Sequence, residues 1–386
     1  MKEKISIVAM SSVSALGENE NEIWENYRHR VSLITKGTYD KFSALRSEIQ
    51  EKHWNKIQEL RNVKNYRDLD SSVLLAIYAA RKAFVNSSWG REEFGINIGS
   101  SRGATSLFEK YFKEFSENEK GQVSTLSSPT TTLGNISSWV GHDLQSKGPV
   151  ISHSIACSTA LHGLLNGIAW LNSGMSERFL VGGSEASNTP FTLAQMKALK
   201  IYATGDADFP CRSLDMDKTF NSMVLGEAAA VFCLEKGVRP DALAIVEGIG
   251  YATEPLKHNI SISSDADCFQ KSMKMALQNM DGREVDVIVT HAPGTIKGDR
   301  SEYNAIKKVF GTQLPALTSN KWIIGHTLGA SGGMSIEMAI LMMKHQEFIE
   351  VPFSHLSKRP EKIKKVLVNA VGFGGNAVSV LLSLDE

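Results

Sequence analysis

The chain has 386 residues, of which 42% are hydrophobic and 22% charged, and its 42 basic and 42 acidic side chains leave no formal net charge. This composition is typical of a globular protein with a large core and excludes disordered, collagen-like and disulfide-rich classes. Bulk charge gives no indication of a nucleic-acid partner, because the two signs balance and like charges do not form long blocks.

The first apolar run, at residues 5–10, is too short for the hydrophobic region of a signal peptide and far too short to span a membrane. We therefore predict a buried strand there, in a protein of the cytoplasm with no membrane span. The four cysteines lie far apart in the sequence and form no CxxC pair, which argues against a zinc site and a disulfide framework and favours a reducing compartment. They are Cys157, Cys211, Cys233 and Cys268.

Short β-branched runs alternate with helical patterns along the whole chain. The runs predict strands at residues 5–10, 94–98, 179–181, 285–289 and 366–371. Apolar residues at helical spacing predict helices at residues 66–86 and 268–280. Strands that alternate with helices indicate an α/β protein with largely buried sheets.

The two halves of the chain repeat one pattern weakly. In the first half, a strand predicted at residues 151–155 leads through Cys157 into a helix. In the second half, the apolar residues 322–324 lead through His326 into a small-residue helix. Each half thus carries a reactive side chain at the same turn and then ends in a glycine turn followed by an apolar strand.

The charged, proline-containing stretch 236–241 is the expected junction of the two halves, although no flexible linker separates them. We therefore predict an N-terminal half at residues 1–236 that carries the cysteine, and a C-terminal half at residues 237–386 that carries both histidines.

Three side chains stand at positions suited to catalysis. Cys157 lies at the start of a helix, where the free N–H groups and the macrodipole favour the thiolate, so we expect a lowered thiol pKa. His291 follows the strand 285–289 and begins a Gly/Pro loop at the sheet edge where α/β proteins hold ligands. His326 stands between glycines, five residues after Lys321. Each residue alone is more often structural than catalytic, but the set together points to an active site.

The sequence resembles the β-ketoacyl-[acyl carrier protein] synthases, the decarboxylating Cys-His-His condensing enzymes of the thiolase superfamily. The resemblance covers nearly the whole chain and rests on four motifs in the family order. These are Ile-Ala-Cys-Ser-Thr-Ala around Cys157, the loop from His291 to Asp299, Lys321 with Gly-His-Thr-Leu-Gly-Ala around His326, and Gly372-Phe373-Gly374-Gly375 with Asn376 one position early.

The resemblance implies a thiolase-like fold, with two pseudo-duplicated βαβ halves in a layered αβαβα architecture. It implies that the cysteine carries the acyl group and that the two histidines stabilise the enolate formed when a malonyl group loses CO₂. Lys321 is implied to act electrostatically. The backbone N–H groups of Cys157 and Phe373 are implied to form the oxyanion hole.

The closing loop and the pantetheine tunnel are also implied. Phe373 would gate the acyl pocket, the glycines Gly372 and Gly374 on either side of it would take part in substrate binding, and Thr295 would bond the phosphopantetheine arm. No cofactor is expected on the enzyme itself, because acyl carrier protein brings the substrates on its own phosphopantetheine. Malonyl and acyl carrier proteins are therefore the expected partners, with a homodimer or a heterodimer with a ketosynthase-like subunit.

Several positions depart from the family pattern. Ala292 and Pro293 replace Gly-Thr, which removes one pantetheine-binding threonine and stiffens the loop. Val371 replaces a phenylalanine and is expected to widen the acyl pocket. The glutamate expected after His326 falls at Ser335, while Glu337 lies on another helix face, so we expect Lys321 to lack that partner.

The His-Ala-Pro-Gly-Thr variant is similar to ketosynthases of bacterial aryl polyene and flexirubin-type pigment pathways, while ordinary fatty-acid elongation stays open. A thiolase that uses coenzyme A is disfavoured because it needs a second catalytic cysteine, and no cysteine follows Cys268. A non-catalytic chain-length subunit is disfavoured because Cys157 and both histidines are present. The sequence leaves the acyl chain length, the particular carrier protein and the type of dimer open.

Overall fold

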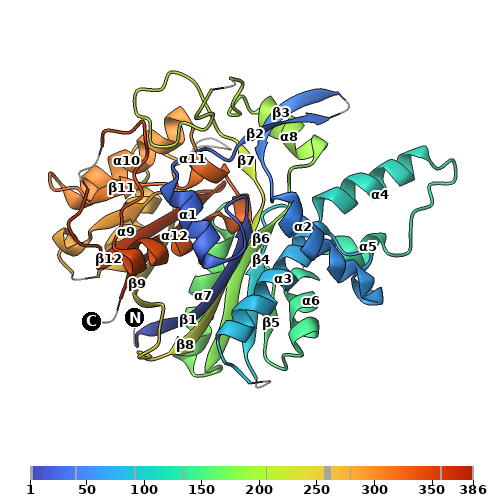
Figure 1. Ribbon diagram of the computed structural model, residues 1–386, viewed down its shortest axis with the longest axis horizontal. Helices are drawn as coiled ribbons and strands as arrows, with labels where there is room; N and C mark the ends of the chain where they lie inside the picture. The colour runs from blue at the N-terminus through green and yellow to red at the C-terminus, as the bar shows by residue number, and fades with distance from the viewer. Residues whose placement is uncertain are drawn as a thin grey trace.

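The computed structural model describes residues 3–39, 41–90, 93–133, 135–205, 207–255, 262–278, 280–356 and 359–384. Within these residues, two five-stranded sheets and one three-stranded sheet form the framework (Figure 1). The first sheet has the spatial order β1 (Ile5–Ser14), β8 (Ala228–Lys236), β6 (Arg178–Glu185), β4 (Gly95–Gly99), β5 (Val150–Ile151). The second has the order β9 (Ala244–Thr253), β13 (Asn376–Ser383), β12 (Lys365–Gly372), β10 (Val287–Val289), β11 (Ala316–Thr318).

The two large sheets have the same pairing pattern. In the first, β1, β8 and β6 are antiparallel neighbours, while β6, β4 and β5 run parallel. In the second, β9, β13 and β12 are antiparallel neighbours, while β12, β10 and β11 run parallel. Each strand of one sheet thus has a counterpart in the other, which confirms the internal duplication.

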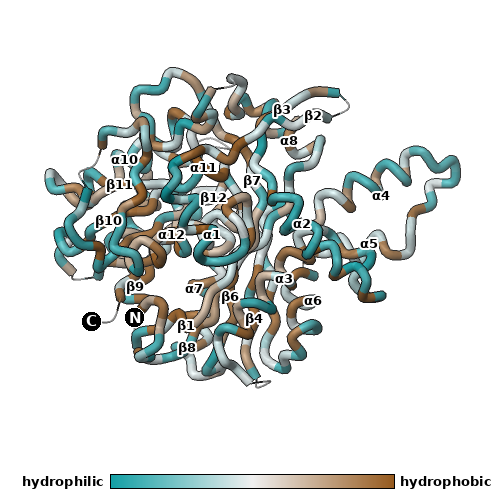
Figure 2. The backbone as a smooth tube through the Cα atoms, in the orientation of Figure 1, coloured by the Kyte–Doolittle hydropathy of each residue, from teal (hydrophilic) through white to brown (hydrophobic). Residues whose placement is uncertain are grey.

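Helices form three layers around the two sheets. Helices α3 (Ser71–Asn86) and α6 (Asn135–Leu144) pack on the outer face of the first sheet. Helices α7 (Thr159–Ser173) and α12 (Ser331–His345) lie between the sheets, and α9 (Asp267–Leu277) and α10 (Ile296–Phe310) lie on the outer side of the second. The predicted αβαβα layering is therefore confirmed, and hydrophobic segments gather in these central layers (Figure 2).

The remaining elements surround this framework. The small sheet consists of β2 (Thr35–Tyr39), β3 (Phe42–Ser47) and β7 (Leu225–Gly226). The other helices are α1 (Glu20–Arg28), α2 (Glu51–Gln58), α4 (Thr105–Glu117), α5 (Ser127–Thr131), α8 (Pro190–Ala198) and α11 (Lys321–Ile324), with 3₁₀ turns η1 (Glu59–Asn62), η2 (Lys64–Tyr66), η3 (Gly282–Glu284) and η4 (Leu328–Ala330). Helix α4 projects away from the body of the molecule (Figure 1).

The strand predicted before the first reactive turn is longer than the one observed. In place of a strand over residues 151–155, β5 ends at Ile151, because the chain beyond it bonds to side chains instead of a neighbouring strand. There the His153 ring lies 2.9 Å from the Asn97 amide nitrogen and 3.0 Å from the Thr159 carbonyl oxygen. Residues 322–324 belong to the one-turn helix α11, and the strand of the second half in that place is β11.

Two helix boundaries also differ from the prediction. Helix α3 begins at Ser71 and not at residue 66, because the Asp70 carboxylate accepts a bond of 2.8 Å from the Ser72 N–H and caps the helix there. Helix α9 ends at Leu277, and Asn279 in the predicted segment 268–280 lies outside the described residues.

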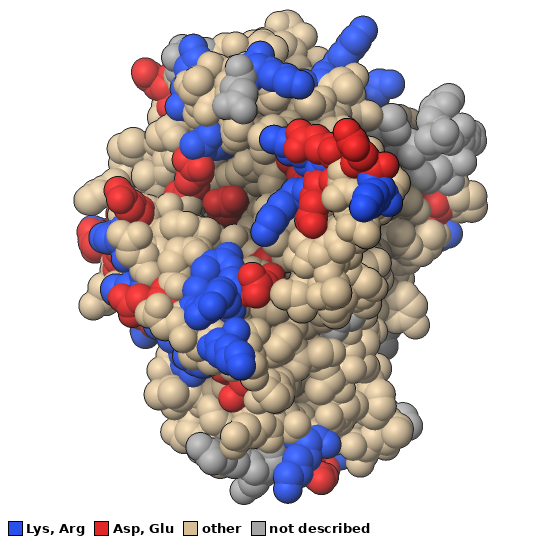
Figure 3. Space-filling model, turned by 90° about the vertical axis from the view of Figure 1, so that its right-hand side faces the viewer, with Lys and Arg blue, Asp and Glu red and all other residues tan. Residues whose placement is uncertain are grey.

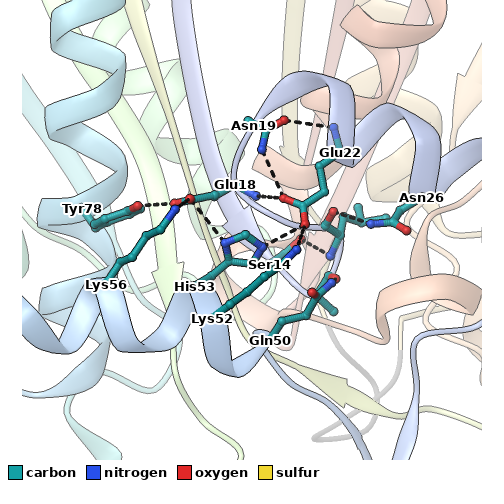
Figure 4. Close-up of polar contacts among 12 residues, drawn as sticks. Ser14, Glu18, Asn19, Glu22, Asn26, Gln50, Lys52, His53, Lys56 and Tyr78 are labelled. Carbon is teal, nitrogen blue, oxygen red and sulfur yellow. Dashed lines mark hydrogen bonds and ion pairs between the residues drawn. The ribbon is translucent and has the colours of Figure 1, made fainter.

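A polar network fastens the turn after β1 to the helices beneath it (Figure 4). Glu18 and Glu22 converge on the buried ring of His53, at 3.4 Å from Nδ1 and 3.0 Å from Nε2. Lys56 and Tyr78 also donate to the Glu18 carboxylate. Since these groups come from the turn, α1, α2 and α3, the network fixes the outer corner of the first half, away from the cavity described below.

Among the described residues, no helix combines the length and the apolar character that crossing a membrane requires.

Candidate active site

Cys157 stands in a sharp turn between β5 and α7. Ala156 before it has a left-handed backbone with φ of 45°, and Ser158 after it is the N-cap of α7. This turn directs the thiol into the interior, where only 6% of the residue is exposed. Burial is the largest influence on the Cys157 thiol, and with the nearby Glu185 carboxylate it raises the thiol pKa to about 12. The expected lowering is therefore wrong, because burial and this negative charge outweigh the helix start.

His291 lies just beyond β10 and is buried. Its backbone N–H donates to Glu302 Oε1 at 2.9 Å, and the N–H of Ala292 donates to Glu302 Oε2 at 2.7 Å. One carboxylate from α10 thus fixes the loop that carries His291. Sequence reasoning missed Glu302, although its position one helical turn after Asp299, on the same helix, was an available signal.

His326 comes from the segment between α11 and α12 and is held by the small sheet. Its N–H donates to the Val224 carbonyl at 2.6 Å, and its own carbonyl accepts from the Gly226 N–H at 3.1 Å. The His326 and His291 rings lie with centroids 5.3 Å apart at an interplanar angle of 84°. Two residues that are 35 positions apart in the sequence are thereby brought edge to face.

Both imidazoles are held in the neutral form. Burial and then the charge of Lys321 lower the pKa of His291 and of His326 well below 6.5. Nδ1 of each ring is buried and has no hydrogen-bond partner among the residues that the structure describes. A neutral imidazole can present an N–H to a developing oxyanion, which is the property needed at a site that stabilises an enolate.

Cys157, His291 and His326 line one cavity of about 310 Å³. Phe373 and Thr295 also line it, so the structure brings together residues from both halves of the chain. The remaining wall is mainly apolar and includes Met196, Ile201, Met223, Ile262, Leu328 and Val371. The arrangement offers a nucleophile, two neutral N–H donors and space for an apolar group.

Lys321 lies behind the histidines and does not line the cavity. It is 1% exposed, and its ammonium group donates to the Thr290 carbonyl at 3.5 Å. Burial lowers the Lys321 pKa to about 8, while the charge of Glu302 opposes this lowering. As expected, Lys321 forms no ion pair with a carboxylate among the described residues, because Glu302 acts on it only through its charge and Glu337 accepts a bond from Ser12 elsewhere.

A buried ion pair supports the same loop from below. Lys218 donates to Asp299 Oδ2 at 2.6 Å, and both side chains are almost fully buried. The two carboxylate oxygens of Asp299 also accept from the N–H groups of Gly294 and Leu214, each at 3.0 Å. The pair therefore ties the His291 loop to the chain before β7, an attachment that the sequence alone did not reveal.

The closing loop meets the nucleophile turn closely. A Cβ on Gly372 would lie 2.6 Å from the Ile155 carbonyl oxygen, so only glycine fits there. Phe373 follows with 47% of its surface exposed at the mouth of the cavity. Gly374, predicted to bind substrate, is not part of the lining and forms the turn between β12 and β13 with φ of 106°.

Thr295 caps helix α10, where its Oγ1 accepts from the Gly298 N–H at 3.2 Å, and it also faces the cavity. Pro293, which departs from the family pattern, lines the cavity as well. Among the described residues, no cluster of three or more His, Cys, Asp or Glu side chains is placed to hold a metal ion.

Comparisons with known proteins agree with this arrangement. Residues 2–238 match the family described as Beta-ketoacyl synthase, N-terminal domain, and residues 243–354 match Beta-ketoacyl synthase, C-terminal domain. The chain is 26% identical to 3-oxoacyl-[acyl-carrier-protein] synthase 2 of Coxiella burnetii, with 99% of both chains covered. It is 25% identical to the chloroplastic 3-oxoacyl-[acyl-carrier-protein] synthase I of Arabidopsis thaliana, over 99% of this chain and 87% of that protein.

Solved structures share the fold. A β-ketoacyl synthase from Burkholderia phymatum has a TM-score of 0.86 at 21% identity, with 100% of both chains covered. The ishigamide ketosynthase/chain length factor has a TM-score of 0.85 at 19% identity over 100% of both chains. A ketosynthase from Xenorhabdus doucetiae in complex with its chain length factor has a TM-score of 0.80 at 19% identity, over 100% of this chain and 98% of that one.

Proposed function

The chain belongs to the β-ketoacyl synthase family, and from this membership we propose that it joins an acyl group held on Cys157 to malonyl-acyl carrier protein by decarboxylative condensation. The family places it among the acyltransferases with condensing activity. The observation that carries the residue assignment is the meeting of Cys157, His291 and His326 in one cavity.

Acyl transfer to Cys157 is the first step of the proposed reaction. The Cys157 sulfur attacks the thioester of the acyl carrier protein, and the pantetheine sulfur leaves. The proton of the Cys157 thiol passes to that departing sulfur, so the step consumes no net proton. Because its pKa is raised, the Cys157 thiol is protonated at neutral pH, so it must give up its proton as its sulfur attacks.

Decarboxylation and condensation follow. The malonyl thioester loses CO₂, and the electron pair of the broken carbon–carbon bond forms an enolate. The neutral His291 and His326 rings donate N–H bonds to the enolate oxygen. The enolate carbon then attacks the acyl carbonyl on Cys157, the new carbon–carbon bond forms, and the Cys157 sulfur leaves and takes one proton from solvent.

Lys321 and Glu302 set the conditions for these steps without touching the substrate. The ammonium charge of Lys321 disfavours protonation of both imidazoles, as the lowered pKa values of His291 and His326 reflect. Glu302 holds the His291 loop through two backbone bonds and balances the lysine charge. Lys321 is thus an electrostatic positioning residue.

The backbone N–H groups of Cys157 and Phe373 are the proposed oxyanion hole for acyl transfer. Both residues line the cavity, and Gly372 brings the two turns into contact. Phe373 gates the acyl pocket, and Thr295, whose oxygen accepts from the Gly298 N–H, bonds the phosphopantetheine arm of the carrier protein with its free hydroxyl proton. The enzyme itself holds no cofactor.

The pathway is either fatty-acid elongation or polyene and polyketide elongation in the cytoplasm. We favour an aryl polyene or flexirubin-type pathway, because the His-Ala-Pro-Gly-Thr loop places the rigid Pro293 ring in the cavity wall.

The partner subunit is proposed to bind at helix α4. Phe108, Phe112 and Phe115 of this projecting helix recur at helical spacing and are 63%, 68% and 52% exposed. Helix α4 also carries charged residues such as Lys110, Lys113 and Glu114, and the face toward which it projects has both charged clusters and broad uncharged areas (Figure 3). Exposed apolar patches of this kind mark protein interfaces, so a second ketosynthase-like chain, identical or different, is the proposed occupant.

Mass spectrometry of the intact protein tests the function. Incubation with acyl-loaded carrier proteins of increasing chain length should add one acyl group to Cys157, and Cys157→Ala should remove the adduct while leaving the fold intact. Malonyl carrier protein added to the acylated enzyme should then release CO₂ and a 3-oxoacyl product. Equal acyl loading of Cys157→Ala, or loading with no product from the parental protein, would reject the proposal.

A further inference from the structure

The carboxylate of Glu185, at the end of β6, is the most densely bonded acid near the active site. The residue is 0% exposed, and Oε2 accepts from the Gly329 N–H at 2.9 Å and from the Ser101 N–H at 2.8 Å. Oε1 accepts from the Ser100 hydroxyl at 3.0 Å and from the Arg102 N–H at 3.2 Å. One carboxylate thus joins a loop of the first half to the His326 segment of the second.

The internal duplication relates the turn that Glu185 contacts to the turn that carries Cys157. Ala156 and Leu328 have the same left-handed backbone, with φ of 45° and 42°, and each stands three residues before the first residue of α7 or α12. Cys157 and Gly329 are therefore equivalent positions. The Glu185 carboxylate accepts from the Gly329 N–H, the counterpart of the Cys157 N–H proposed for the oxyanion hole, so a carboxylate oxygen of the protein occupies the equivalent place in the second turn.

The packing around Gly329 requires this arrangement. A Cβ on Gly329 would lie 2.5 Å from the Ser101 nitrogen and 2.8 Å from Glu185 Oε2. Leu328, the residue before it, keeps its strained backbone and lines the cavity. A strained backbone persists only where surrounding contacts hold it in place, and here the Glu185 carboxylate supplies that contact through its bond to the Gly329 N–H. Since His326 precedes Leu328 by two residues, the same bond restricts His326.

We propose that Glu185 is a positioning residue of the condensing reaction, whose carboxylate fixes the turn at Gly329 and thereby the place of His326 relative to Cys157. This inference rests on the proposed function for its catalytic consequence. Its structural and electrostatic parts concern the protein alone. The electrostatic part is that Glu185 is buried near Cys157, so the negative charge of its ionised carboxylate disfavours the Cys157 thiolate.

Two variants of Glu185 and one matched control separate geometry from charge. Glu185→Gln removes the charge and points an amide at N–H donors, whereas Glu185→Asp keeps the charge but shortens the reach. Glu337→Gln is the control, because Glu337 is equally buried, its pKa is also raised to about 7 by burial, and it bonds Ser12 away from the cavity. Release of CO₂ from malonyl carrier protein should fall on the order of tenfold to a hundredfold in both Glu185 variants and stay at the parental rate in the control.

The alkylation rate of Cys157 by iodoacetamide, followed against pH, is a readout that a merely structural role would not move. Burial raises the Glu185 pKa to about 7, so the slope of the parental rate against pH should decrease around pH 7, where Glu185 ionises and opposes the thiolate. The charges of Lys321 and Arg102 favour the thiolate, and Lys321 loses its proton at about pH 8, so its effect on the slope lies above that of Glu185. This decrease in slope near pH 7, the bend in the curve of alkylation rate against pH, should be absent in Glu185→Gln and present in Glu185→Asp and Glu337→Gln.

A bend that survives in Glu185→Gln, or parental CO₂ release in either Glu185 variant, would overturn the inference. If Glu185→Gln does not fold, Glu185→Asp still decides the matter through CO₂ release. Failure of the proposed function looks different: the parental protein would then release no CO₂, while the bend and its loss in Glu185→Gln would still be measured.

Discussion

Replacing Lys321 by methionine should raise the stability of the folded protein and at the same time lower its rate of CO₂ release from malonyl carrier protein. Burial lowers the Lys321 pKa from 10.5 to about 8. Since each pH unit corresponds to about 1.4 kcal/mol, keeping this ammonium charged below pH 8 costs the folded state about 3 kcal/mol. The pKa is lowered in the folded state, so stability should rise as the pH increases from 8 to 10.5 in the parental protein and not in Lys321→Met.

Lys218→Met is the matched control, and we expect it to change the stability in the opposite direction. Lys218 is the other lysine buried at this site, but Asp299 Oδ2 lies 2.6 Å from its ammonium nitrogen, whereas no carboxylate among the described residues lies within ion-pair distance of Lys321. Removal of one partner of a buried pair leaves the other unpaired and costs about 3 to 5 kcal/mol. The free energy of unfolding measured in urea at pH 7 should therefore be higher for Lys321→Met than for the parental protein, and lower for Lys218→Met.

The catalytic consequence of Lys321→Met has its own measurement. Without the ammonium charge, His291 and His326 should protonate at higher pH, so release of CO₂ from malonyl carrier protein should fall and its acidic limb should move toward neutral pH. A variant that is less stable than the parent by more than about 1 kcal/mol would refute the reasoning, because it would mean that Glu302 more than repays the burial of the charge.

The remaining predictions concern single elements of the site. His291→Ala and His326→Ala should stop the release of CO₂ while Cys157 still accepts acyl groups, as measured by intact mass; parental CO₂ release in either variant would contradict its role. Gly374→Val should slow acyl loading at least about tenfold and slow decarboxylation less, because a side chain at φ of 106° restricts the loop that moves Phe373; equal losses for short and long acyl donors would reject gating. Phe112→Glu should shift the protein toward monomer in sedimentation velocity without loss of secondary structure, and an unchanged sedimentation coefficient would remove α4 from the proposed interface.

The order of the site residues could be predicted from the sequence because it depends on local patterns. Apolar runs, glycine turns and helix patterns flank Cys157, His291 and His326 in the sequence, and the structure brings these three residues to one cavity. The internal duplication was visible for the same reason, since each half repeats a run of local signals in one order. The fold class followed from those signals and from the family motifs.

Other features depended on contacts between residues far apart in the chain. Glu185 meets Gly329 across 144 residues, and Lys218 meets Asp299 across 81. No local sequence pattern identifies such partners, because the packing of the two sheets determines which of the many acidic residues comes into contact. The carboxylate whose charge acts on Lys321 could not be predicted for this reason, because Glu302 belongs to α10 and not to the helix where the family pattern has a glutamate.

Protonation was likewise decided by the tertiary structure. From the sequence, the helix start at Cys157 indicates a lowered thiol pKa, yet burial and the Glu185 charge raise it. The short β5 in place of a longer strand has a similar origin, because His153 bonds Asn97 and Thr159 and draws the chain out of the sheet. Hydrophobic periodicity reports which residues avoid water, so it determined the strands, the helices and the order of the reactive groups. Only the packed protein determines how deeply a charge is buried and which partner it meets, because desolvation and hydrogen bonding act over distances in space and not along the sequence.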